Sequence, residues 1–212
     1  MKTKGPHHGW SRMRIDHVIY GTDDLDAAAA RFADELGLPI ARGGRHDALG
    51  THNRIVPLGD GSFIELLAVA DREEAMRSPL GAALCAAIER GNGFLGWAVG
   101  VVDIDGVARR LGTSITTVCR QGMVARLSGV LEALEEPYLP FFIERGADWR
   151  RSVAHAAAGL SWIEVTGQAA RLERWLGGAR LPVRVLDGPP AVRAIAIGDH
   201  ELRLRDERWS NA

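Results

Sequence analysis

The chain has 212 residues and a mass of 23.0 kDa, which is enough to form a hydrophobic core without disulfide cross-links. Hydrophobic residues make up 46% and charged residues 25%, as in ordinary globular proteins, which excludes a disordered or fibrous chain. Because 26 Lys and Arg are balanced by 27 Asp and Glu, the net charge of −1 offers no field to attract nucleic acid or anionic lipid.

The sequence also indicates where the protein works. It has no apolar run of the roughly 18 residues that a membrane-spanning helix needs, so no contact with a membrane is expected. Residues 1–12 lack the apolar stretch of a secretory signal and are expected to be an extension outside the fold. Cys85 and Cys119, which have no CxxC spacing, are typical of core thiols in a reducing compartment. Together these features predict a cytoplasmic protein.

Residues 13–70 form the first unit of an internal repeat. A strand containing His17 is followed by a helix over 25–36, which begins after an Asp and ends at Gly37. Three further strands are expected over 39–45, 53–58 and 62–69, so the unit has the order β-α-β-β-β.

Residues 94–145 repeat this order at a displacement of 79 residues. A strand containing Gly96 leads to an Asp-capped helix over 104–111 that ends at Gly112. Further strands are expected over 115–119, 124–131 and 139–144. The ends of the two units match as well, because Phe63-Ile64-Glu65 is displaced by the same interval from Phe142-Ile143-Glu144. Residues 71–93 are expected to form a linker with a helix over 80–90.

A third, weaker copy is expected over residues 160–212, after a loop at 146–159. Leu202-Arg203-Leu204 stands in place of the Phe-Ile-Glu ending, so we interpret this copy as structural, extending or covering the sheet. An odd copy leaves a sheet edge to be covered, which favours a homodimer. The predicted fold class is α+β, built from repeated β-α-β-β-β modules.

His17, Glu65 and Glu144 are the chemical candidates within these modules. Each lies in an apolar strand, and a buried carboxylate needs a charged partner, hydrogen bonds or a metal ion. If the first two modules pack with approximate two-fold symmetry, the three side chains converge on one centre. The alternative is that the glutamates pair with arginines such as Arg54 or Arg126, with His17 a hydrogen-bonded core residue.

The sequence resembles the vicinal oxygen chelate superfamily, and within it the glyoxalase-like domain proteins of the glyoxalase/bleomycin resistance/dioxygenase type. The resemblance spans Met13 to about Ile197. The motifs that carry it are Ile15-Asp16-His17-Val18, Asp24-Leu25-Asp26, Gly43-Gly44-Arg45-His46, Gly50-Thr51-His52-Asn53, Gly59-Asp60-Gly61-Ser62-Phe63-Ile64-Glu65-Leu66 and Leu139-Pro140-Phe141-Phe142-Ile143-Glu144. It implies a cupped, barrel-like mixed sheet around a divalent metal ion, with ligands on the first and last strands of each module.

In this resemblance His17, Glu65 and Glu144 match metal-ligand positions, while Gly96 stands at the fourth. The missing ligand would come from water, the substrate or a neighbour such as His155. One imidazole and two carboxylates favour a Lewis-acid ion (Mg, Mn, Ni, Co or Zn) over an Fe(II) dioxygenase centre. The implied function is a metal-dependent isomerase or lyase acting on a small oxygenated metabolite, with Glu144 as the base. The alternative is a non-catalytic binding or sequestration protein of the same fold.

Four further residues are candidates for substrate binding. His46, His52 and Asn53 match the glyoxalase-like pattern, and the alternative is a loop held by its own hydrogen bonds. Trp97 follows the empty ligand position and either lines a pocket or belongs to the core. The run 149–151 is either a clamp for an anionic substrate or a solvated loop.

Overall fold

The computed structural model describes residues 13–46, 48–59, 61–91, 93–120, 123–146, 159–205 and 208–211. The predictions for residues 1–12, for His155 and for the run 149–151 lie outside the described residues. Within the described ranges, no helix is both long and apolar enough to cross a membrane.

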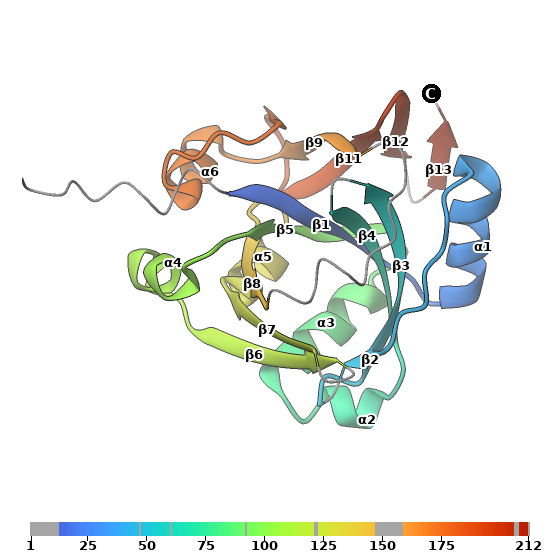
Figure 1. Cartoon of the computed structure of the whole chain (residues 1–212), viewed down its shortest axis with the longest axis horizontal. Coiled ribbons are helices and arrows are strands. Elements are labelled where there is room, and N and C mark those ends of the chain that lie inside the picture. The colour runs from blue at the N-terminus through green and yellow to red at the C-terminus, as the bar shows by residue number, and fades with distance from the viewer. Residues whose placement is uncertain are drawn as a thin grey trace, which may run out of the picture.

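The larger sheet is built from the first two modules. Its strands are β1 (Arg14–Gly21), β2 (Arg45–His46), β3 (Thr51–Gly59), β4 (Ser62–Val69), β5 (Gly93–Gly100), β6 (Ile115–Arg120), β7 (Met123–Ser128) and β8 (Phe141–Arg145). Their order is β2-β3-β4-β1-β5-β8-β7-β6, so each module places its first strand beside its last. The sheet curls into a nearly closed barrel in which the edge strands β2 and β6 come together (Figure 1). This confirms the α+β fold of repeated β-α-β-β-β modules.

The first strands of the two modules pair at the centre of the sheet. β1 and β5 are antiparallel, with Val18 beside Trp97, His17 beside Ala98 and Ile19 beside Gly96. Val18 and Trp97 are 79 positions apart and therefore equivalent in the repeat. The approximate two-fold axis that relates the modules thus passes through this pair.

The helices of the modules begin and end where the sequence indicates. They are α1 (Leu25–Leu36) and α4 (Ile104–Leu111) in the first two modules and α6 (Ala169–Leu176) in the third. The Asp24 and Asp103 carboxylates accept hydrogen bonds from backbone N–H groups of the first turns of α1 and α4, a cap that contributes about 1 kcal/mol. All three helices end at a glycine in the left-handed region, with φ of 61°, 71° and 64° at Gly37, Gly112 and Gly177.

Two segments differ from their predictions. The strand expected over 124–131 ends at Ser128, because Gly129 has φ 75° and turns the chain into a helix, α5 (Val130–Glu135). The strand expected over 39–45 is reduced to β2, preceded by a single bridge from Ala41 to Ile55.

The linker contains two helices, α2 (Arg72–Ala75) and α3 (Pro79–Glu89), of which α3 matches the predicted one. Ser78 caps α3 by accepting a hydrogen bond from the Gly81 N–H, and Pro79 occupies its first position. Helices α3 and α5 lie within the curve of the larger sheet (Figure 1), so they cover its concave face.

The C-terminal residues form a second sheet. Its strands are β9 (Leu160–Thr166), β10 (Val183–Leu186), β11 (Ala191–Ile197), β12 (His200–Arg205) and β13 (Arg208–Asn211), in the order β10-β9-β11-β12-β13. The β-α-β-β-β order of elements is present, but β9 lies between the next two strands instead of beside the last. The third module is therefore not a topological copy of the other two. Ile163 and Ile195 are buried in one cluster with Val18 and Trp97, so this sheet covers the convex face of the larger one.

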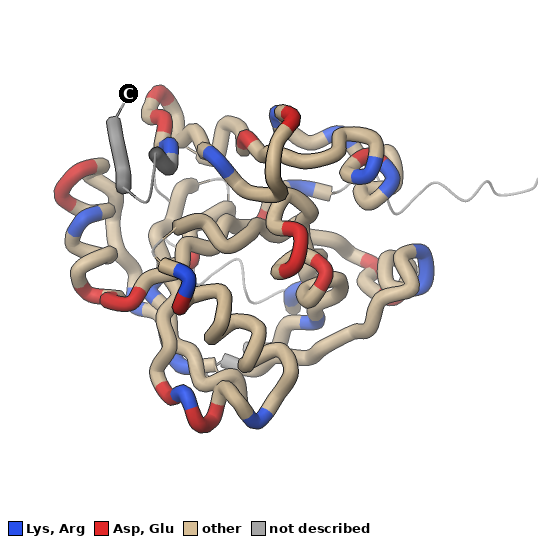
Figure 2. Tube along the Cα trace, turned by 180° about the vertical axis from the view of Figure 1, so that it is seen from behind, with Lys and Arg blue, Asp and Glu red and all other residues tan. Residues whose placement is uncertain are grey.

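Separate hydrophobic clusters occupy the two faces of the larger sheet. The convex face packs against α1, α4 and the second sheet, and the concave face packs against α3 and α5. Charged residues of both signs are mixed along the helices and turns of the chain (Figure 2).

Candidate active site

The concave face encloses a cavity of about 950 Å³, counting the part open to solvent. Its wall is mostly apolar, with Leu80 and Leu84 from α3, Val130 and Leu134 from α5, and side chains from the strands of both modules. Val124 of β7 lines the cavity and is also 52% exposed, so the cavity reaches solvent beside this strand. The polar lining residues are His17, His46, Asn53, Glu65 and Arg145.

His17 is held by its neighbour Asp16. The pairing of β1 with β5 shifts between Ile15 and His17, and this bulge turns both Asp16 and His17 toward the concave face. His17 Nδ1 donates to Asp16 Oδ1 at 2.7 Å, and both side chains are only 3% exposed. The hydrogen bond fixes the orientation of the imidazole and directs Nε2 into the cavity.

Arg145 at the end of β8 binds the Asp16 carboxylate that holds His17. Its guanidinium donates to Asp16 Oδ1 from Nε at 3.0 Å and from Nη2 at 2.7 Å, and Nη2 lies 3.3 Å from His17 Nδ1. Burial by itself would raise the pKa of Asp16, but the charges of Arg145 and His17 outweigh it and hold that pKa well below its ordinary value of 3.8. Asp16 is therefore ionised, and the positive charge of Arg145 is neutralised by it.

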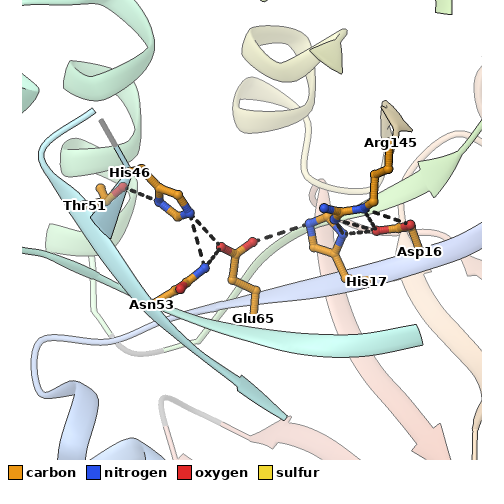
Figure 3. A network of polar contacts seen from close by, with 7 residues as sticks. All are labelled: Asp16, His17, His46, Thr51, Asn53, Glu65 and Arg145. Carbon is orange, nitrogen blue, oxygen red and sulfur yellow. Dashed lines mark hydrogen bonds and ion pairs between the residues drawn. The ribbon is translucent and has the colours of Figure 1, made fainter. Parts of the chain in front are cut away.

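Glu65 of β4 lies at the centre of the polar group (Figure 3). Its Oε2 is 3.5 Å from His17 Nε2, and its Oε1 is 3.4 Å from His46 Nε2. Burial favours a raised pKa for Glu65, but the His46 and His17 imidazoles and a hydrogen bond from Asn53 outweigh burial and lower that pKa below its ordinary value of 4.5. The cavity thus contains an ionised carboxylate.

Asn53 of β3 and His46 of β2 hold the other side of Glu65. The Gly44 N–H donates to Asn53 Oδ1 at 2.9 Å, so the Asn53 amide nitrogen donates to Glu65 Oε1 at 2.5 Å and points at His46 Nε2 at 3.2 Å. On its other side the His46 imidazole is held by a hydrogen bond between its Nδ1 and Thr51 Oγ1 at 2.9 Å. Asn53 and His46 thus hold the Glu65 carboxylate from one side.

Aromatic rings fix the His17 imidazole from two directions. The Phe63 ring stacks on it at 4.7 Å with an interplanar angle of 7°, and the Phe141 ring meets it edge-on at 5.4 Å. Packing and the bond to Asp16 together leave His17 little rotational freedom.

The expectation that Glu144 faces the same cavity is wrong. Glu144 lies on the convex face, where Arg126 Nη1 donates to its Oε2 at 3.0 Å and the Ile104 N–H donates to its Oε1 at 3.4 Å. The alternative considered from the sequence, pairing with Arg126, is correct. On geometric grounds Glu144 is therefore neither a ligand nor a base for chemistry in the cavity.

The strand register explains this error. Ile19 of β1 lies beside Glu65, whereas Ala98, its equivalent in β5, lies beside Phe141. The structural counterpart of Glu65 is thus Phe141, three positions before Glu144. Side chains alternate between the faces of a strand, so a shift by an odd number of residues moves Glu144 to the opposite face.

Two of the predicted substrate-binding residues also lie away from the cavity. Trp97 is fully buried on the convex face, where its Nε1 donates to the Tyr138 carbonyl at 3.2 Å, so it belongs to the core. His52 faces a separate surface hollow together with Arg42 and Arg54, because it alternates with Asn53 along β3. Burial and the nearby charge of Arg54 lower the pKa of His52.

Sequence reasoning assigned no role to two residues of the polar group, Asp16 and Arg145. Asp16 was visible as a charged residue inside an apolar strand, which by itself calls for a buried partner. Arg145 had no comparable signal, since only the strand pairing brings it to residues 128 positions away.

The nearly closed sheet of repeated β-α-β-β-β modules is a glyoxalase-like fold. A family model described as a glyoxalase-like domain matches residues 15–180, and the chain belongs to that family. No curated protein matches the sequence.

Comparison with solved structures gives one match over nearly the whole chain and weaker ones over about two thirds of it. A hypothetical protein from Staphylococcus aureus superposes with a TM-score of 0.73 at 18% identity, over 94% of this chain and 98% of that one. A methylmalonyl-CoA epimerase from Mycobacterium tuberculosis gives a TM-score of 0.49 at 21% identity, over 64% of this chain and 89% of that one. The Streptomyces coelicolor epimerase with 2-nitronate-propionyl-CoA gives 0.46 at 20% identity, over 63% and 98%.

Divalent metal ions are common in the vicinal oxygen chelate superfamily, but the side chains of the cavity do not fit one. A catalytic zinc site uses about three protein ligands. Of the expected ligands only His17 and Glu65 line the cavity. Gly96 has no side chain, Phe141 stands at the position equivalent to Glu65, and Glu144 lies on the opposite face. His46 lies on the far side of the Glu65 carboxylate (Figure 3), where the Asn53 amide donates. Among the described residues, no group of three or more His, Cys, Asp or Glu side chains is arranged to hold a metal.

We therefore expect that titration calorimetry with Mn²⁺, Ni²⁺ or Zn²⁺ gives the same heats for the wild type and for His17→Ala. This comparison is needed because His7 and His8 in the N-terminal segment offer other imidazoles. Stoichiometric binding that His17→Ala and Glu65→Gln both remove would contradict the expectation and show that Glu65 turns to bring both imidazoles onto one ion.

Proposed function

We propose that the protein is an isomerase or lyase of the glyoxalase-like kind that removes a proton from a carbon next to a carbonyl group. The observation that carries the proposal is the ionised Glu65 carboxylate in an apolar cavity, 3.5 Å from the Nε2 of an imidazole whose other nitrogen is fixed by Asp16. In this arrangement a base can act on a C–H bond of a ligand while an acid acts on the oxygen of the neighbouring carbonyl group.

In the proposed step, Glu65 removes the proton. The C–H bond breaks, an O–H bond forms on the Glu65 carboxylate, and the electron pair moves to the carbonyl oxygen to give an enolate-like species. His17 Nε2 donates a hydrogen bond to this oxygen, and the negative charge of Asp16 stabilises the positive charge on the imidazole. Where the α-carbon bears a hydroxyl group, that hydroxyl passes its proton to the former carbonyl oxygen and becomes the new carbonyl, and Glu65 returns its proton to the neighbouring carbon, which completes an isomerisation.

The test is deuterium incorporation from deuterium oxide, followed by proton NMR. The probes are hydroxyacetone and its straight-chain homologues up to hydroxydecanone, because each has a hydrogen-bearing carbon beside a carbonyl. Exchange that is faster than in buffer and lost in Glu65→Gln supports the proposal. Absence of enzyme-dependent exchange for every probe would overturn it.

A sequestration protein is the second candidate, favoured by the same apolar cavity. It predicts tight binding of a probe with no exchange, and equal binding by the wild type and Glu65→Gln. The two candidates are therefore separated by measuring binding and exchange on the same samples.

A further inference from the structure

The cavity divides into a polar group and an apolar remainder. All five polar lining residues belong to the connected group around Glu65 (Figure 3). The rest of the wall is aliphatic or aromatic, and it extends under α3 and α5 to the exposed Val124. A ligand that fills this space must bury mostly hydrocarbon and place its polar atoms at one end.

The charges of the polar group restrict that end further. Arg145 is the one Arg or Lys among the described lining residues, and its guanidinium is already bonded to Asp16. Glu65 keeps a negative charge in the cavity. Among the described lining residues, the groups that can carry positive charge already face other carboxylates, Arg145 facing Asp16 and the His17 and His46 imidazoles facing Glu65. A carboxylate or phosphate on the ligand would compete with Glu65 for these groups, at a cost that an uncharged carbonyl or hydroxyl avoids.

We infer that the ligand is an uncharged molecule, mostly hydrocarbon, with a carbonyl or hydroxycarbonyl group at one end. This inference rests on the proposed function for the role of the polar end and goes beyond it in naming the substrate class. The polar end contacts His17 and Glu65, and the hydrocarbon lies along the wall formed by α3 and α5.

Gly96 gives a way to test the apolar part. It lines the cavity, a Cβ atom at this position would have nothing within 4 Å, and its backbone is not in the left-handed region. Gly96→Leu therefore adds a side chain to the cavity wall with no clash at its Cβ atom and no backbone strain. Gly146, which also has open space at its Cβ position and lies outside the described lining, gives the matched control Gly146→Leu.

The experiment measures dissociation constants for hydroxyacetone, its straight-chain homologues up to hydroxydecanone, and decanoate. Because each buried methylene contributes about 0.8 kcal/mol, affinity is expected to rise about fourfold per added CH₂ until the cavity is full. Hydroxydecanone is expected to bind at least tenfold more tightly than decanoate. Gly96→Leu is expected to reduce the gain in affinity per added CH₂, and Gly146→Leu is expected to leave that gain unchanged.

Three outcomes overturn the inference: affinity that does not depend on chain length, decanoate binding as tightly as hydroxydecanone, or a gain with chain length that Gly96→Leu does not alter. Failure of the proposed function is distinct. Chain-length-dependent binding without deuterium exchange would reject the proton-transfer role and keep the substrate class. If hydroxyacetone exchanges as fast as hydroxydecanone and all homologues bind with the same affinity, the proton-transfer role is kept and the substrate class is rejected.

Discussion

Glu65→Gln is expected to slow enzyme-dependent deuterium exchange by about 10²- to 10⁴-fold, the usual contribution of a general base. Glutamine retains the size of the side chain and an oxygen that accepts the Asn53 hydrogen bond, but it cannot take a proton. The loss should therefore appear in the exchange rate measured by proton NMR, with ligand binding largely retained. A variant that keeps a tenth or more of the wild-type rate would show that Glu65 is not the base.

Glu144→Gln is the matched control. It makes the same chemical change in the other strand-end glutamate, whose carboxylate bonds to Arg126 on the convex face. Exchange should stay within about twofold of the wild type, and the loss of this partly exposed ion pair should change the free energy of unfolding little, because solvent screens it. If Glu144→Gln were the slower variant, the assignment of the base from the sequence repeat would be right after all.

The fold could be predicted in large part because its signals are local. Asp24 and Gly37 mark the ends of α1, and Asp103 and Gly112 mark those of α4, so these caps, together with the matching strand motifs, made the repeat visible. Helix α5 was missed because its residues continue the apolar run of β7, and only the left-handed Gly129 separates the two. Short apolar runs do not distinguish a strand from a helix.

The site was less predictable because it depends on strand register. His17, Glu65, His46 and Asn53 all belong to the first module, where the motifs predicted them, and the structure brings these four together. The second module was expected to contribute a carboxylate and instead contributes Arg145 and an apolar wall. Pairing of β5 with β8 differs by three residues from the pairing of β1 with β4, a shift that no spacing within the sequence reveals.

Asp16→Asn is expected to lower the free energy of unfolding by about 3 to 5 kcal/mol at neutral pH, the usual cost of breaking a buried ion pair. Asp16 is 3% and Arg145 12% exposed, so the variant leaves the guanidinium without its counter-charge in a nearly dry environment. Asp105→Asn removes a partner of Arg126 from a pair that is 52% and 37% exposed, and should lower the free energy of unfolding far less than Asp16→Asn does, because solvent screens this pair. Urea unfolding of the three proteins measures both values, and equal costs would contradict the role given to Asp16.

The cost of Asp16→Asn should also depend on pH in a defined direction. Arg145 and His17 hold the pKa of Asp16 in the folded protein well below the ordinary value of 3.8 that it regains on unfolding. Its contribution is therefore fully present above about pH 5 and is lost progressively as the pH falls below 3.8, because the unfolded chain then binds a proton that the folded protein does not. The difference in unfolding free energy between wild type and Asp16→Asn should be constant from pH 7 to about pH 5 and shrink steadily at lower pH. A difference that grows on acidification would mean that the carboxyl is protonated in the folded protein, and it would remove the buried Asp16–Arg145 ion pair as the support that orients His17.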